Sequence, residues 1–187
     1  MRIIRWVPAA LILFIAAPSF AQDWIDYEDR VERFRVNFPG QPKVQDIQYP
    51  SAEGGTLPAR LYTAQAGPGR YSVTVVNYIG ADPTTVRASM AWAAWNFRKK
   101  GGEITYDAFA QVDRIEGHQL QITNADKSRT FVAIHLHARR LYILEATVPG
   151  NFPAPGLFQQ SLSILDEQGN RIRYNLDADG NRTTRVR

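Results

Sequence analysis

Apolar side chains alternate along much of the chain as in short β-strands, and residues 71–79 give the strongest pattern. Nearly every residue of this run is β-branched or aromatic, and both faces carry apolar groups. That pattern favours a central strand covered on both sides. One face is expected to carry Tyr71, Val73 and Val75, and the other Val76 and Tyr78.

A helix is predicted directly after this strand. Asp82 can accept hydrogen bonds from free backbone N–H groups, and Pro83 suits the first helical position. Gly101 and Gly102 can adopt the left-handed backbone conformation that commonly ends a helix. The apolar stripe at helical spacing consists of Val86, Met90, Ala93 and Phe97.

Short strands are predicted before and after the helix. Residues 33–38, 43–49, 56–65 and 71–79 are expected to form an antiparallel meander, with Phe34, Val36 and Phe38 facing the core. Residues 130–137 and 141–148 are expected to form a hairpin. A three-residue connection around Arg139 would place His135 opposite Glu145. Residues 156–165 have nearly helical apolar spacing and are predicted to form a C-terminal helix.

The C-terminal region contains an internal repeat. The segment from Leu165 to Arg171 recurs eleven residues later, from Leu176 to Arg182. Asp, Gly and Asn at these positions are turn-forming residues. We therefore expect two turns separated by a short strand, in a tail over residues 166–187.

The first 21 residues resemble a secretory signal peptide. Arg2 and Arg5 form a basic region, an apolar run follows over residues 7–17, and residues 19–21 fit a cleavage site. The apolar run is too short for a transmembrane helix, so no transmembrane segment is expected after signal removal. We therefore expect a periplasmic or secreted protein. The sequence has no cysteine, which excludes disulfides, thiol nucleophiles and a lipoprotein anchor.

The formal net charge of +4 is concentrated near the two ends of the chain. Residues 171–187 contain five arginines and two aspartates, so the high pI gives no argument for nucleic-acid binding. The tail could bind a partner or an anionic surface, or it could be a solvated terminus. Its candidate contact residues are Arg171, Arg173, Arg182 and Arg185.

Trp92 and Trp95 fall on the side of the predicted helix away from its apolar stripe. Another segment could cover them, for example the N-terminal arm around Trp24 and Tyr27. Alternatively, the two tryptophans form an exposed aromatic patch that binds a partner.

His135 and His137 are two residues apart, so on a strand they share one face. With Glu145 beside them they would match the ligand set of an open zinc site. The alternative is a pair of polar residues on a partly exposed strand face. Common hydrolase, phosphate-loop and dinucleotide motifs are absent from the sequence, and we expect no cofactor.

Three segments together resemble the PsbP-like (DcrB-like) family of small exported envelope proteins. The segment from Phe34 to Pro42 resembles the family's opening F-x-V-x-F-P-x-x-P. Residues 140–146 resemble its penultimate strand, and residues 158–162 resemble its closing helix. The resemblance implies an antiparallel sheet packed between helices. Family members mostly act as extrinsic or binding proteins without a shared catalytic set, so no site residue carries over.

The sequence therefore predicts an α+β fold over residues 22–165. It would contain a single antiparallel β-sheet of about six to eight strands, one long helix, a C-terminal helix and a short C-terminal β extension. The expected function is that of a monomeric, non-enzymatic binding or accessory protein with an envelope protein as partner. The alternatives are a metal-dependent hydrolase or metal carrier using the His135/His137 strand, and a structural module whose tail pairs with another chain.

Overall fold

The computed structural model describes residues 24–183. The signal peptide predicted over residues 1–21 and the tail residue Arg185 lie outside the described residues. The elements, in chain order, are β1 (Ile25–Asp29), β2 (Phe34–Phe38), β3 (Lys43–Pro50), β4 (Thr56–Ala66), β5 (Gly69–Asn77), α1 (Pro83–Arg98), β6 (Glu103–Val112), β7 (Ile115–Thr123), β8 (Arg129–His137), β9 (Arg140–Val148), α2 (Gly156–Gln159), β10 (Ser163–Ile164), β11 (Asn175–Leu176) and β12 (Arg182–Thr183).

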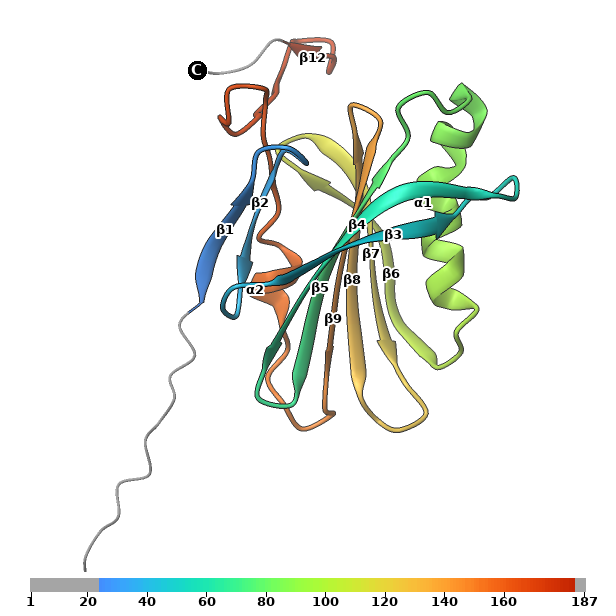
Figure 1. Ribbon diagram of the computed structural model, residues 1–187, viewed down its shortest axis with the longest axis vertical. Helices are drawn as coiled ribbons and strands as arrows, with labels where there is room; N and C mark the ends of the chain where they lie inside the picture. The colour runs from blue at the N-terminus through green and yellow to red at the C-terminus, as the bar shows by residue number, and fades with distance from the viewer. Residues whose placement is uncertain (1–23, 184–187) are drawn as a thin grey trace, which may run out of the picture.

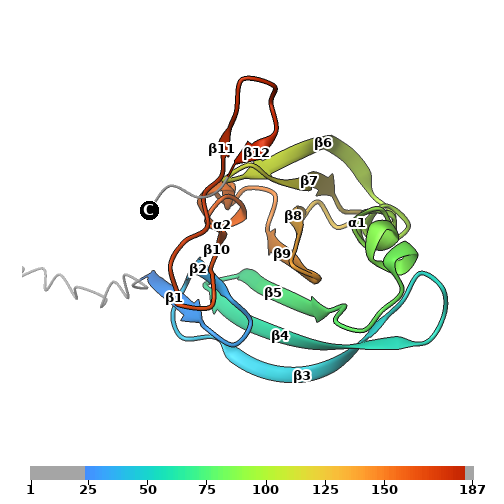
Figure 2. The ribbon, with the colours of Figure 1, turned by 90° about the horizontal axis from the view of Figure 1, so that it is seen from above.

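A seven-stranded antiparallel sheet in the order β3-β4-β5-β9-β8-β7-β6 forms the middle layer. Helix α1 packs on one face, and the other face carries a small sheet, β1-β2-β10, together with α2 (Figures 1 and 2). The tail ends in the β11–β12 hairpin. The protein therefore has three layers, and each face of the large sheet has its own core.

Strand β5 is buried on both faces, as its sequence predicts. Tyr71, Val73 and Val75 belong to the core under the small sheet, whereas Val76 and Tyr78 belong to the core under α1. Neighbours β4 and β9 pair with β5 on its two sides. A strand in this position has no exposed face, which explains its continuous apolar sequence.

Helix α1 begins where the sequence predicts. The Asp82 side chain accepts a hydrogen bond from the Thr84 backbone N–H at 2.7 Å, and Pro83 is the first helical residue. Ala93 and Phe97 are buried against the large sheet, and Val86 and Met90 pack at the edge of this core. The predicted apolar stripe is therefore the face that anchors α1.

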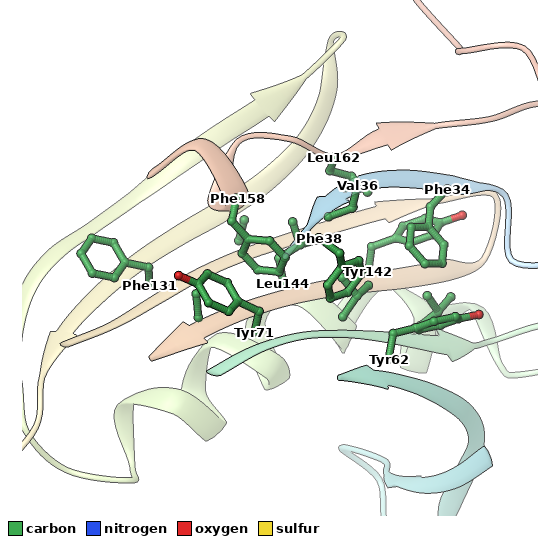
Figure 3. Close-up of a cluster of buried hydrophobic side chains, with 14 of the residues drawn as sticks. Phe34, Val36, Phe38, Tyr62, Tyr71, Phe131, Tyr142, Leu144, Phe158 and Leu162 are labelled. Carbon is green, nitrogen blue, oxygen red and sulfur yellow. The ribbon is translucent and has the colours of Figure 1, made fainter. Parts of the chain in front are cut away.

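Aromatic side chains fill the core between the two sheets (Figure 3). Phe34 and Phe38 of β2 are fully buried, as the alternating pattern predicts. Two tyrosine hydroxyls tie the layers together: Tyr62 donates to the Asp29 carboxylate at 2.7 Å, and Tyr142 donates to the Glu32 carbonyl at 3.0 Å. Because both hydroxyls have acceptors, they lie in this core without an unpaired donor.

The predicted α+β class is wrong: residues 24–183 are mostly β, with two short helices and several sheets. The predicted C-terminal helix is only the four residues of α2, after which the chain turns into β10. Ser161 explains this change of direction. Its hydroxyl donates to the Phe158 carbonyl and accepts from the Asn37 backbone N–H of β2, so the segment joins the small sheet.

The predicted four-strand meander is wrong in its first member. Strands β3, β4 and β5 form consecutive antiparallel pairs, but β2 pairs with β1 and β10 in the other sheet. A strand whose alternate side chains are apolar can bury them in either sheet. The apolar spacing alone therefore did not show which sheet β2 would join.

The predicted register of the β8–β9 hairpin is also wrong. Ala138 and Arg139 both have positive φ, at 45° and 59°, and form a two-residue connection in place of the expected three-residue one. His135 consequently lies opposite Tyr142, and Glu145 lies opposite Val132. The shift is an odd number of residues, so Glu145 points to the opposite face of the sheet from His135.

The two copies of the tail repeat form turns with the same hydrogen bonds, as predicted. In each turn the backbone N–H of the aspartate bonds the carbonyl of the asparagine four residues on, for Asp166 with Asn170 and for Asp177 with Asn181. Between the two turns, Arg171 forms an isolated bridge with Leu165 and the chain then forms β11, so the strand expected directly after the first turn is displaced toward residues 175–176.

Candidate functional site

Trp92 and Trp95 stack on the outer side of α1, with ring centroids 5.1 Å apart and an interplanar angle of 22°. Lys99 lies over both rings, its ammonium 4.2 Å from the Trp95 centroid and 5.3 Å from that of Trp92. Trp95 is 48% exposed, whereas Trp92 is only partly exposed. We call these three residues the tryptophan surface.

The end of strand β3 holds the tryptophan surface in place. The indole N–H of Trp92 donates to the Pro50 carbonyl at 2.9 Å, and Asn96 hydrogen-bonds Tyr49, whose pKa is raised mainly by burial. The Trp92 ring is thereby held in place, and the Trp95 ring remains accessible. The stack is a preorganised aromatic contact surface.

One interpretation of the sequence was that the N-terminal arm covers the tryptophans, and the structure shows that it does not. Trp24 packs edge-on against Tyr71, with centroids 5.3 Å apart, and Tyr27 packs against Phe38. Both contacts lie in the core under the small sheet, on the opposite side of the large sheet from α1.

The ionisable side chains of α1 itself are all basic. Helix α1 contains no Asp or Glu, and Arg87 and Lys99 are exposed on it. Arg98 is engaged in a bidentate pair with Asp107, and Lys100 lies 3.7 Å from a Glu145 oxygen. Arg87 and Lys99 are therefore the helix cations that remain for a partner.

A second polar cluster joins α1 to β6 and β7, and the sequence interpretation missed it. Arg98 and His118 both contact the Asp107 carboxylate, and the hydrogen bond from Arg98 is the main reason that the pKa of Asp107 falls to about 2. The exposed Phe109 ring packs edge-on against His118. No hydroxyl nucleophile hydrogen-bonds His118 among residues 24–183, so the cluster is an ion pair that fastens the helix end.

His135, His137 and Glu145 are not brought together. Burial lowers the pKa of His135 to about 4, and burial with nearby arginines lowers that of His137. His137 packs against Tyr174, while Glu145 faces the α1 side near Lys100. Within the described part of the chain, no three His, Asp or Glu side chains gather as a metal site would require.

The tail arginines that the structure describes make internal ion pairs. Arg171 contacts Asp113 at 2.6 and 3.1 Å, Arg173 approaches the same carboxylate at 3.9 Å, and Arg182 lies 3.3 Å from Glu116. These contacts dock the tail on the β6–β7 turn. The positive charge of these arginines is thus largely paired with carboxylates of the same chain.

No protein-family model matches this chain, and no curated protein matches it either. The resemblance to PsbP-like proteins thus stays a prediction. Neither helix in residues 24–183 has the length and apolar character needed to cross a membrane.

Sequence reasoning found the two tryptophans but missed Lys99. The signal was available, because Lys99 lies four residues after Trp95 and seven after Trp92, on the same helical face. The Asp107–His118 contact gave no such signal, because it depends on strand pairing between β6 and β7.

Proposed function

We propose that this protein is an exported, non-enzymatic binding or accessory protein of the cell envelope, and that it docks a protein partner on the tryptophan surface. The observation that carries the proposal is the Trp92–Trp95 stack, which is fixed at Pro50 and leaves Trp95 half exposed.

Such an arrangement suits protein binding for a physical reason. A stacked, hydrogen-bonded indole loses little side-chain freedom when a partner arrives, so most of the burial energy contributes to affinity. Tryptophan also dominates binding energy at many protein interfaces. The small side chains Ala88 and Ala91 lie one helical turn from the tryptophans and permit a close approach to the helix.

The charge of the surface indicates the chemistry of the partner. Arg87 and Lys99 are exposed, and neither forms a salt bridge within residues 24–183, although the capping Asp82 interacts with Arg87. A partner segment with one apolar or aromatic anchor flanked by carboxylates would complement both features. We therefore propose an acidic protein partner bound to this chain as a monomer.

The proposed location rests on the sequence. The basic and apolar pattern over residues 1–21 fits export, and a cysteine-free chain with a large buried core needs no disulfide outside the cytoplasm. The resemblance of residues 34–42 to PsbP-like proteins supports the same environment. Both support a periplasmic or secreted location.

The contacts of the histidines support a binding role over catalysis. His118 is held by Asp107 and Arg98, and the side chain of His135 is almost wholly buried. Neither histidine has a hydroxyl partner among the described residues that it could activate.

The proposal is tested by partner capture from the native envelope with the tagged mature chain and its Trp95→Ala and Lys99→Glu variants. Leu157→Ala is the matched control, because Leu157 is a still more exposed apolar residue and lies on α2, on the other side of the large sheet. We expect one partner to be lost with both variants and kept with the control. Equal capture by all four proteins would refute the assignment of this surface.

A further inference from the structure

A hollow of about 470 Å³ lies between the β6–β7 edge of the large sheet and the segment that contains α2 and the start of the tail. It is on the face that carries the small sheet, opposite the tryptophan surface. Its polar lining includes Gln119 of β7, His135 of β8 and Gln159 of α2. It is thus separate from the proposed docking site.

His135 is the first feature that points to a ligand. The residue is only 3% exposed, and its buried Nδ1 atom has no well-aligned hydrogen bond within the described residues, although the backbone of Ile115 and Glu116 lies close enough to interact with the ring. The ring fits only because Gly117 lies opposite it on β7: a Cβ atom on Gly117 would be 2.2 Å from Nδ1. A buried polar atom without a partner is rare in folded proteins and marks a place where a ligand or water completes the site.

Gln159 is the second feature. Its amide nitrogen donates to the Val132 carbonyl at 2.7 Å and to the Leu120 carbonyl at 3.4 Å, which fixes the side-chain orientation. The amide oxygen accepts no hydrogen bond from residues 24–183. Gln159 is as deeply buried as His135, so this oxygen is a fixed acceptor at the wall of the hollow.

The charges that line the hollow cancel each other. Asp113 and Arg171 line it together and form a bidentate pair with each other. His135 is uncharged at neutral pH, since burial lowers its pKa to about 4. An ionic ligand would lose its hydration there and gain no unpaired opposite charge, whereas a neutral ligand loses less.

One aromatic residue completes the lining. Tyr106 is half exposed and borders the hollow on edge strand β6. Neutral sugars have hydroxyl groups that donate and accept hydrogen bonds, and they have an apolar C–H face that packs on aromatic rings. Amides, an imidazole and an aromatic ring around one hollow match both properties.

We propose that the hollow between β6, β7 and α2 binds a neutral pyranose sugar, with Gln119, His135 and Gln159 as its hydrogen-bonding residues and Tyr106 as its packing surface. This site is independent of the tryptophan surface. The protein would therefore carry a sugar-binding site on one side of the large sheet and a protein-binding surface on the other.

The test uses nitrogen-15 NMR of the mature chain titrated with maltose and with the disaccharide of N-acetylglucosamine. We expect one of the two to shift the His135 ring nitrogens and the Gln159 side-chain amide. Gln119→Leu, on a strand face that is only partly buried, should weaken that binding about tenfold or more, as loss of a hydrogen-bonding group in a site does. Glucuronate should bind more weakly than glucose, which has the same ring without the carboxylate.

Gln41→Leu is the matched control, because Gln41 is an exposed glutamine beside a different hollow. It should leave the titration unchanged, and thermal unfolding of both variants shows that they are folded. The proposal is overturned if neither sugar shifts the His135 or Gln159 signals, because the hollow then holds only water. It is also overturned if Gln119→Leu and Gln41→Leu bind equally well.

Discussion

Gly117 lies directly opposite His135 in the β7–β8 pair, and any side chain at position 117 would occupy the space of the imidazole. A Cβ atom there would also lie 2.5 Å from the Ile134 carbonyl oxygen, which belongs to the backbone and cannot move away cheaply. The glycine is therefore required by packing.

Gly117→Ala should lower the free energy of unfolding by roughly 2 kcal/mol or more, as overpacking of a core does. Urea unfolding measures it. Gly156→Ala is the control, since a Cβ on this α2 residue meets nothing within 4 Å, and it should be neutral or stabilising by up to ~1 kcal/mol. Equal midpoints for the two variants would contradict this account of Gly117.

Lowering the pH should destabilise the protein through His135. Its pKa is about 4 in the folded state and 6.5 when unfolded, so the unfolded chain binds the proton more tightly between these values. Stability from this group is complete above pH 6.5 and falls as the pH drops toward 4, by up to roughly 3 kcal/mol.

The measurement is the unfolding free energy of the wild type and of His135→Leu at intervals from pH 7 to pH 4. The difference between the two curves isolates His135 from the carboxylates. This difference should change steadily across the range, whereas His137, whose pKa is also lowered, contributes equally to both curves and cancels. Parallel curves would show that His135 is not buried as a neutral group.

The two stacked tryptophans should differ in their effect on stability. Trp92→Ala removes the hydrogen bond to the Pro50 carbonyl and a partly buried ring, and should cost roughly 2 kcal/mol. Trp95→Ala removes a half-exposed ring and should cost less than ~1 kcal/mol. Near-ultraviolet circular dichroism should lose the signal of the coupled indoles in both variants, and a larger loss of stability for Trp95→Ala would contradict the structure.

Asp113→Asn should release the tail, because Arg171 and Arg173 both contact this carboxylate. Limited proteolysis is the measurement: chymotrypsin, whose sites at Tyr174 and Leu176 are the same in all these proteins, should cleave the tail faster in the variant than in the wild type. Arg173→Ala, which removes only the 3.9 Å contact, should have a smaller effect than Arg171→Ala. Identical digestion of all these proteins would show that the ion pairs do not hold the tail.

The sequence predicted those elements whose determinants are local. Asp82 and Pro83 located the start of α1, and the two-sided apolar pattern of residues 71–79 identified the central strand. Phe34 and Phe38 were correctly placed in a core. These features depend on capping and periodicity, which neighbouring residues determine.

Features that depend on turn geometry and pairing were not predictable in the same way. Ala138 and Arg139 adopt positive φ without the Gly or Asn that usually signals such a turn, and the resulting register separates Glu145 from the histidines. Ser161 ends α2 through a contact with β2, which is distant in the sequence. The exposure of Trp95 likewise depends on what the rest of the chain leaves uncovered.

The central claim, that a partner docks on the tryptophan surface, is tested most directly by site-specific photocrosslinking in the native envelope. A photoreactive residue replaces exposed Ala91, which lies one turn from Trp95, and in the control it replaces Leu157, which is 85% exposed on α2. We predict one discrete crosslinked protein from position 91, absent from position 157 and lost when Trp95→Ala is added. Crosslinks that are absent from position 91, or unchanged by Trp95→Ala, would contradict the account.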